Sequence, residues 1–178
     1  MTVGATIMFF FGAIWLLLGL YGGKPSSLRL RAGLLLAGLA LATWIGIAGI
    51  RTARQSRSAP PPTAKQAEIE RQVGRRFGWI TAIEGVAIFL AVALLKAAHR
   101  SDAITSAIAL IVGLHFFPLA ALFGASVYHL TGLLGCAIGI TGLLISEQAL
   151  RSKVVGLSFG LLLWFTSAAV LLQISVLS

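Results

Sequence analysis

Hydrophobic positions in this chain form long uninterrupted blocks. Six blocks can be drawn, over residues 3–21, 32–50, 77–98, 103–123, 128–145 and 154–177. Each is close to the length of about 20 residues with which a helix rising about 1.5 Å per residue crosses about 30 Å of hydrocarbon. The blocks lack the in–out alternation of membrane β-strands, and a helix satisfies its own backbone in lipid. The pattern therefore predicts an all-α polytopic membrane protein, a six-helix transmembrane bundle that forms one domain over residues 1–178.

Composition supports the same class of protein. Apolar residues make up 58% of the chain and charged residues 11%, whereas soluble domains carry about 25% charged residues. The net charge of +9 comes from lysines and arginines that, apart from Lys96, lie between the blocks. The expected partner is therefore the lipid bilayer with its anionic headgroups, and no nucleic acid is expected. The first block has no basic region before it and exceeds the apolar core of about 7–15 residues of a signal peptide, so we expect it to be retained as a span.

The distribution of lysine and arginine leaves the orientation open. Six spans put both termini on one side together with the long connection 51–76, and each side carries 7 of the 14 basic residues. We expect the termini to be cytoplasmic in the inner (plasma) membrane, because the long connection concentrates its charge beside its two flanking spans. Dual topology and the reverse orientation are the alternatives.

The segment 51–76 is a basic connecting segment with a proline-rich break, "APPPT". Three consecutive prolines end any helix that continues from the second span. Thr63 and Gln66 then form a capping-box pattern, which predicts that the third helix begins near Ala64 and extends about 13 residues, roughly 20 Å, into the cytoplasm before it enters the bilayer. The candidate lipid-binding or partner-binding residues of this extension are Arg71, Arg75, Arg76 and Trp79. Headgroup binding is the simpler interpretation, and a docking surface for a protein partner at 51–76 is the alternative.

Glu84 lies well inside the third block, in "ITAIEGVAIFL". A carboxylate near the middle of a spanning helix costs roughly 2.5–3.5 kcal/mol on insertion scales, so such residues usually face the bundle and mark function. Thr81, Ala87 and Ala91 are expected to share the face of Glu84, and small residues allow a neighbouring helix to pack closely. A structural polar contact is the alternative to a functional site.

His115 and Pro118 interrupt the fourth block, "IVGLHFFPLAALF". Adjacent spans run antiparallel, so His115 and Glu84 count to nearly the same depth. Pro118 has no amide hydrogen, which leaves the carbonyl of Leu114 without its helical partner and predicts a kinked fourth span. Glu84, His115, Pro118, Leu114 and Thr81 are therefore the candidate substrate or proton site.

Tyr128 and His129 open the fifth block on the same side of the membrane. They are candidates for an access path from water to the site, and interfacial anchors are the alternative. The two histidines 115 and 129 differ in depth and lack carboxylate or thiolate neighbours at ligand spacing, so no metal and no cofactor is expected.

Two further patterns concern packing. Glu147 lies four residues before Arg151 and suggests a surface ion pair, and Arg100 and Asp102 are expected in a solvated turn. Four glycines recur at intervals of three or four residues along the fifth block, at positions 132, 135, 139 and 142. Such a small-residue face packs inside the bundle or forms the seam of a homo-oligomer.

The segments "RRFGWITAIEGVAIFLA" and "IALIVGLHFFPLAALFGASVYHLTG" resemble uncharacterised bacterial integral membrane proteins that carry a "GLHF-PLA" segment followed by an aromatic pair. The resemblance covers about the central third of the chain. It implies a small bacterial inner-membrane protein and no particular activity. Here the second member of the aromatic pair is His129, which departs from the pattern.

The leading functional prediction is a proton-linked transporter or channel-like protein, expected to form a homo-oligomer, with a buried Glu–His site. The alternative is a non-catalytic structural or accessory subunit that holds a partner through its basic segment. An enzymatic role is the less favoured class, because no catalytic triad, HExxH or paired-carboxylate motif is present.

Overall fold

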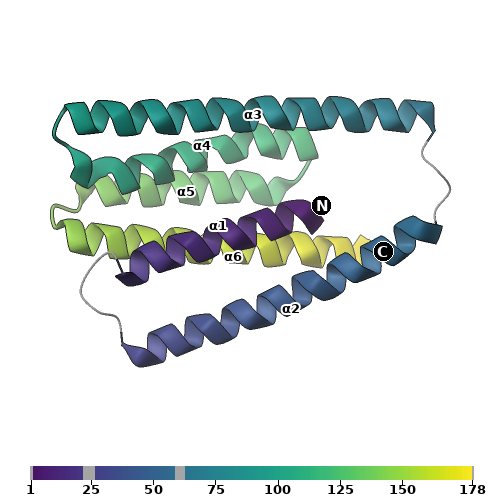
Figure 1. The fold of residues 1–178 in the computed structure, drawn as a ribbon, viewed down its shortest axis with the longest axis horizontal. Helices are drawn as coiled ribbons and strands as arrows, with labels where there is room; N and C mark the ends of the chain where they lie inside the picture. Colours follow the sequence, from purple (N-terminus) through teal and green to yellow (C-terminus); the bar gives the residue numbers. More distant parts are fainter. Residues whose placement is uncertain (1, 22–26, 59–62, 178) are drawn as a thin grey trace.

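The computed structural model describes residues 2–21, 27–58 and 63–177, and these ranges contain helices and no strand. The elements are α1 (Thr2–Tyr21), α2 (Leu28–Ser58), α3 (Ala64–Ala97), the short 3₁₀ helix η1 (Ser101–Ala103), α4 (Ile104–Phe123), α5 (Ser126–Leu144) and α6 (Gln148–Leu177) (Figure 1). Each α-helix is long and apolar enough to cross a membrane, which confirms the predicted number of candidate spans.

The helix ends differ from the predicted blocks mainly where charged residues occur. α2 continues to Ser58, well into the segment predicted as a connection, and α6 begins at Gln148, ahead of the predicted start at residue 154. The hydrophobic blocks mark only the apolar part of each helix, so they do not include helix ends that are made of polar residues. At Thr63 the capping box is confirmed, because its backbone amide donates to Oε1 of Gln66 (2.9 Å) and its Oγ1 accepts from the Gln66 amide (3.3 Å). The prolines at 60–62 lie outside the described residues.

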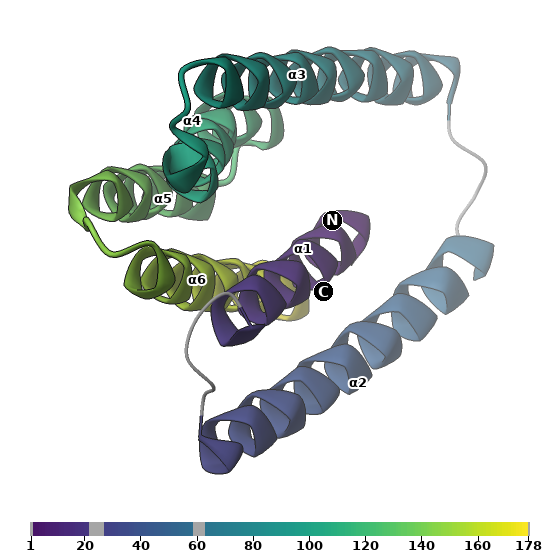
Figure 2. The same ribbon diagram turned by 60° about the vertical axis from the view of Figure 1, so that its left-hand side comes forward.

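The helices form a curved row whose order in space differs from their order in the chain. Packing contacts run from α2 to α1, then to α6, α5, α4 and finally α3. Figure 2 shows α2 and α3 at the two ends of this row although they follow one another in sequence. Neighbouring helices in the row are antiparallel, and α1 packs most extensively against α6.

Glycines bring α4 and α5 into close contact. A Cβ on Gly113 would lie 2.6 Å from the backbone nitrogen of Cys136, and one on Gly139 would lie 2.7 Å from that of Leu110. These distances are shorter than side chains tolerate, so the two backbones meet only because the side chains are missing. All four glycines of the predicted stripe on α5 are buried. The stripe therefore packs inside the bundle and does not form the seam of a homo-oligomer.

A second glycine seam joins α1 to α6. A Cβ on Gly156 would lie 2.4 Å from the backbone nitrogen of Gly19, and one on Gly160 would lie 2.8 Å from the carbonyl oxygen of Gly12. Gly156 and Gly160 have the GxxxG spacing of close helix pairs. This seam joins the first helix to the last.

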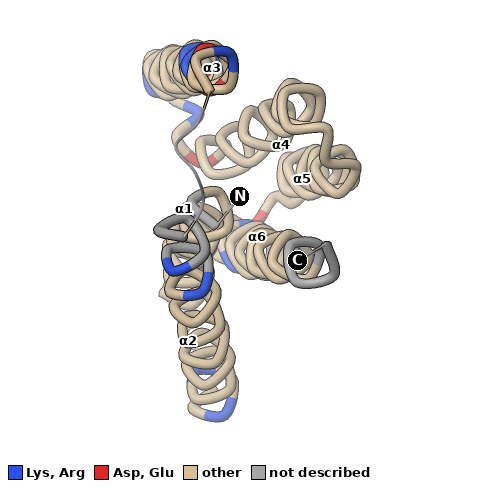
Figure 3. The backbone as a smooth tube through the Cα atoms, turned by 90° about the vertical axis from the view of Figure 1, so that its right-hand side faces the viewer, with Lys and Arg blue, Asp and Glu red and all other residues tan. Residues whose placement is uncertain are grey.

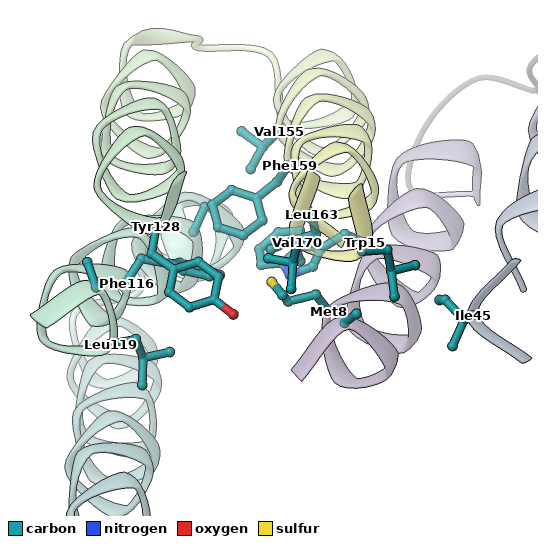
Figure 4. Packing of buried hydrophobic residues seen from close by; sticks show 14 residues of the cluster. Met8, Trp15, Ile45, Phe116, Leu119, Tyr128, Val155, Phe159, Leu163 and Val170 are labelled. Atoms are coloured by element: carbon teal, nitrogen blue, oxygen red, sulfur yellow. The ribbon is translucent and has the colours of Figure 1, made fainter. Parts of the chain in front are cut away.

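Large side chains fill the space around the two seams (Figure 4). Phe159 is fully buried and its ring lies 4.8 Å from that of Trp15, centroid to centroid. Phe116 and Tyr128 pack 5.8 Å apart between α4 and α5. The core is therefore centred on α1, α4, α5 and α6, while α3 contributes no buried residue.

Candidate functional site

One face of α3 rests against α4 and carries Glu84. Ile80, Glu84, Ala87 and Ala91 are half-buried along this face, at the spacing of three or four residues that a helix stripe requires. Thr81 is exposed, so the expectation that it shares the buried face is wrong. The half-buried stripe includes Ile80, four positions before Glu84, and excludes Thr81, three positions before it.

His115 lies on the face of α4 that meets α3. Its Nδ1 is 3.3 Å from Oε2 of Glu84, and the two side chains are 11% and 16% exposed. The antiparallel pairing of α3 and α4 explains the contact, because Phe77 and Phe123, farther along the same two helices, also meet with ring centroids 6.1 Å apart. The structure thus brings together the two residues that depth counting had paired.

The distance between Nδ1 of His115 and Oε2 of Glu84 is that of an ion pair, but the geometry at these atoms is not that of a hydrogen bond. Within the described part of the chain, the buried Nδ1 of His115 has no hydrogen-bond partner. A carboxyl–imidazole pair with no net charge exists in two forms. It is either a carboxylic acid beside a neutral imidazole or a carboxylate beside an imidazolium. Gain or loss of one proton therefore changes the net charge of the pair by one unit.

Pro118 and Leu114 lie beside the pair on α4 and are both exposed. α4 runs as one helix from Ile104 to Phe123 with Pro118 inside it. Because proline has no amide hydrogen, the carbonyl of Leu114 has no helical donor four residues on. The backbone of α4 thus lacks one regular helical hydrogen bond within a turn of His115.

The predicted access path does not form a continuous polar route. Tyr128 is buried and His129 is exposed, since consecutive side chains of a helix diverge by about 100°. The ring of Phe116 packs against both His115 (6.1 Å between centroids) and Tyr128 (5.8 Å). An apolar ring thus lies between Tyr128 and the pair, and the ring of His129 packs against Phe117 instead.

The basic residues of the α3 extension lie at the surface. Arg71, Arg75, Arg76 and Trp79 are all exposed, and the charged groups of α3 collect toward its N-terminal part (Figure 3). Within the described residues none of the three arginines makes an ion pair with an acidic side chain. These side chains are accessible, and their binding to headgroups or to a protein partner stays a prediction.

A buried arginine that the sequence did not reveal ties the other end of the bundle together. Arg151 is only 4% exposed, and its guanidinium donates to Oδ2 of Asp102 (2.6 Å) and, through Nε, to the carbonyl oxygen of Ile145 (2.9 Å). The expected surface pair of Glu147 with Arg151 is wrong, because Arg151 turns inward and Glu147 is exposed. The local spacing of four residues favoured Glu147, whereas Asp102 is 49 positions away in the sequence.

Neither of two surface grooves reaches the Glu84–His115 pair. A groove of about 490 Å³ between α5 and α6 is lined by apolar side chains together with the hydroxyls of Thr141 and Ser158. A second, of about 410 Å³, lies on α1 beside Tyr21. Among the described residues, no group of three or more histidine, cysteine or acidic side chains is placed to hold a metal ion.

Comparison of the chain with protein-family models, curated proteins and solved structures finds no match. The resemblance drawn from the "GLHF-PLA" segment stays a prediction.

Proposed function

We propose that this chain is a small multi-pass protein of the inner (plasma) membrane, with cytoplasmic termini and a cytoplasmic N-terminal extension of α3. Six helices of suitable length and apolar character support membrane insertion. The exposed arginines of α3, followed one turn later by exposed Trp79, suit the boundary between water and lipid.

Within that setting, the proposed function is proton-linked transport through a site formed by Glu84 and His115. The observation that carries the proposal is the 3.3 Å contact between these side chains in the α3–α4 seam. Ionisable groups at such a depth are costly and mark proton or substrate pathways in transporters. When the neutral Glu84–His115 pair gains or loses a proton, the α3–α4 seam must accommodate a net charge of one unit.

The proposed moving part is α3 with the adjoining half of α4. α3 packs chiefly against α4 and contributes no buried residue, so few contacts oppose its displacement. In this proposal α4 is kinked at Pro118, one turn from His115, and the kink lets the C-terminal end of α4 tilt while the glycine seam holds the rest. Protonation of the pair would then bias the position of α3.

The experiment measures proton entry into proteoliposomes that contain a pH-sensitive dye, under an imposed membrane potential. Glu84→Gln keeps the size of the side chain and removes its titration, so proton entry should fall to the level of protein-free liposomes. Glu147→Gln is the matched control, because Glu147 is an exposed carboxylate outside the seam. Unchanged proton entry in Glu84→Gln, with the control also unchanged, would count against this function.

The second candidate is an accessory subunit that binds a partner through the basic segment. It is favoured by the exposure of Arg71, Arg75 and Arg76 and by their lack of acidic partners within the described chain. A stable partner that copurifies with the full chain, and is lost when residues 65–76 are deleted, would support this role and not transport.

A further inference from the structure

α3 has a face that no other part of the described chain covers. α3 lies at one end of the helix row, against α4 (Figure 2). About 100° around the helix from the face that meets α4, a Cβ added to Gly74, Gly78 or Gly85 would meet no atom within 4 Å. By contrast, the glycines of α1 and α6 described above lie within contact of a neighbouring backbone. α3 therefore presents the features of a close helix contact without the second helix.

Opposite charges flank this face where α3 leaves the apolar block. A helix turns by about 100° per residue, so Gly74 and Gly78 point in directions between those of Glu70 and Arg75. Glu70 therefore lies on one edge of the glycine face and Arg75 on the other. Glu70 has no basic residue three or four positions away, and Arg75 has no acidic one. Neither can thus form the usual ion pair within its own helix, and neither pairs with another described residue.

A two-fold arrangement of two copies satisfies both charges. In a parallel helix pair, a residue on one edge meets the residue five positions later on the opposite edge of the partner helix. With Gly74 and Gly78 on the seam, Glu70 of each copy meets Arg75 of the other. The same repeat places Thr81 and Gly85, both exposed, along the seam farther into the apolar block. Two copies inserted with the same orientation around an axis normal to the membrane present α3 in this parallel manner.

We propose that the chain forms a two-fold dimer through α3, with Gly74, Gly78 and Gly85 at the seam and Glu70–Arg75 ion pairs between copies. Glu84 and His115 lie on the face of α3 that meets α4, so dimer formation leaves their contact in place. The dimer requires that both copies insert into the membrane in the same orientation, but it does not require proton transport. Loss of dimerisation and loss of proton transport can therefore be measured separately.

Cysteine cross-linking in native membranes tests the seam. In a Cys136→Ser background, single cysteines replace Gly78, Gly85 or, as a control on the same helix, Ile83. Ile83 is 67% exposed and points away from the proposed seam. Cysteines at 78 and 85 should form covalent dimers on oxidation, and the cysteine at 83 should form several-fold less. Equal cross-linking at all three positions, or cross-linking at 83 alone, would overturn the proposal.

Charge exchange tests the pairing between copies. Glu70→Arg and Arg75→Glu each place like charges opposite one another, so each should reduce the cross-linked fraction at residue 78 several-fold. The double variant restores opposite charges and should recover most of the dimer. If neither single variant changes dimerisation, or the double variant is no better than the single ones, the proposed register is wrong.

Discussion

Buried polar side chains in this protein differ in whether their hydrogen-bonding groups are satisfied. Oγ1 of Thr131 and Oγ1 of Thr166 lie 2.7 Å apart in the α5–α6 seam, and Ser167 donates to the carbonyl oxygen of Ala5 at 2.9 Å. These hydroxyls stabilise contacts between helices, because an unpaired polar group in an apolar interior is costly. Nδ1 of His115 is buried without a hydrogen bond. Oγ of Ser106 is also buried without a partner among the described residues, so what distinguishes His115 is the ionisable side chain of Glu84 at 3.3 Å.

We expect Arg151 to contribute more to stability than any other charged side chain at its end of the bundle. Arg151→Met should lower the thermal unfolding temperature in detergent, because it removes the hydrogen bond to Ile145, and a bond of this charged type contributes about 1.5–3 kcal/mol. Asp102→Asn should have a smaller effect, because its amide oxygen still accepts from the guanidinium. Glu147→Gln is the control and should unfold like the wild type. A loss in Glu147→Gln as large as that in Arg151→Met would instead support the surface pair expected from sequence.

Pairs of helices in this chain are joined by glycine-lined seams with large side chains beside them. In the α1–α6 seam, Nε1 of Trp164 donates to the carbonyl oxygen of Phe9 at 3.0 Å. This hydrogen bond opposes sliding of one helix along the other. In the proposed membrane setting, lipid tails are as apolar as the side chains, so close packing and such hydrogen bonds drive the association of helices. The α1–α6 pair is thus the element most sensitive to added volume.

Gly156→Val should disrupt the α1–α6 pair. The Cβ would lie 2.4 Å from the backbone nitrogen of Gly19, and backbone cannot rotate away as a side chain can. Overpacking of this kind costs about 1–3 kcal/mol or more. Gly46→Val on α2 is the control, since its Cβ would meet nothing within 4 Å. Unfolding temperatures of both variants in detergent test the difference, and equal temperatures would contradict the described seam.

The whole molecule has its first and last helices side by side, so its two parts depend on each other. α1 and α2 come before the connection at 59–62, and α3 to α6 come after it. The α1–α6 contact crosses this division and is larger than that between α1 and α2. The first two helices therefore belong to the bundle through a partner from the other part of the chain.

At this scale, we predict that a chain cut between Ser58 and Thr63 reassembles. Two fragments, residues 1–58 and 63–178, produced together should copurify through a tag on either fragment. Gly156→Val in the longer fragment should abolish copurification, because the contact between fragments depends on the glycine seam. Separation of the unaltered fragments would show that α1 does not hold to α6 as described.

The sequence predicted what depends on local or adjacent features. Helix number follows from the length of the apolar blocks, and the start of α3 follows from Thr63 and Gln66. The meeting of Glu84 with His115 follows because their helices are consecutive and antiparallel, so depth alone pairs them.

Contacts between distant segments could not be predicted in the same way. Most faces of these helices are apolar, so hydrophobic pattern does not indicate that α1 meets α6 rather than α2. Arg151 had a nearer acidic residue in Glu147, and only the fold brings Asp102 within reach. Adjacent aromatic residues likewise gave no sign that Tyr128 turns inward while His129 stays exposed. The GxxxG spacing of Gly156 and Gly160 was the one available signal for the α1–α6 seam.

The α1–α6 seam also has a consequence for biogenesis. Translation releases α1 first, yet its main partner is made only after α2 to α5, a delay on the order of ten seconds at about 5–20 residues per second. In the proposed membrane setting, the glycine-lined surface of α1 faces lipid or the insertion machinery during that interval. Final closure of the bundle would then follow insertion, and chains that terminate early would leave the ribosome with an incomplete bundle that quality-control proteases can recognise.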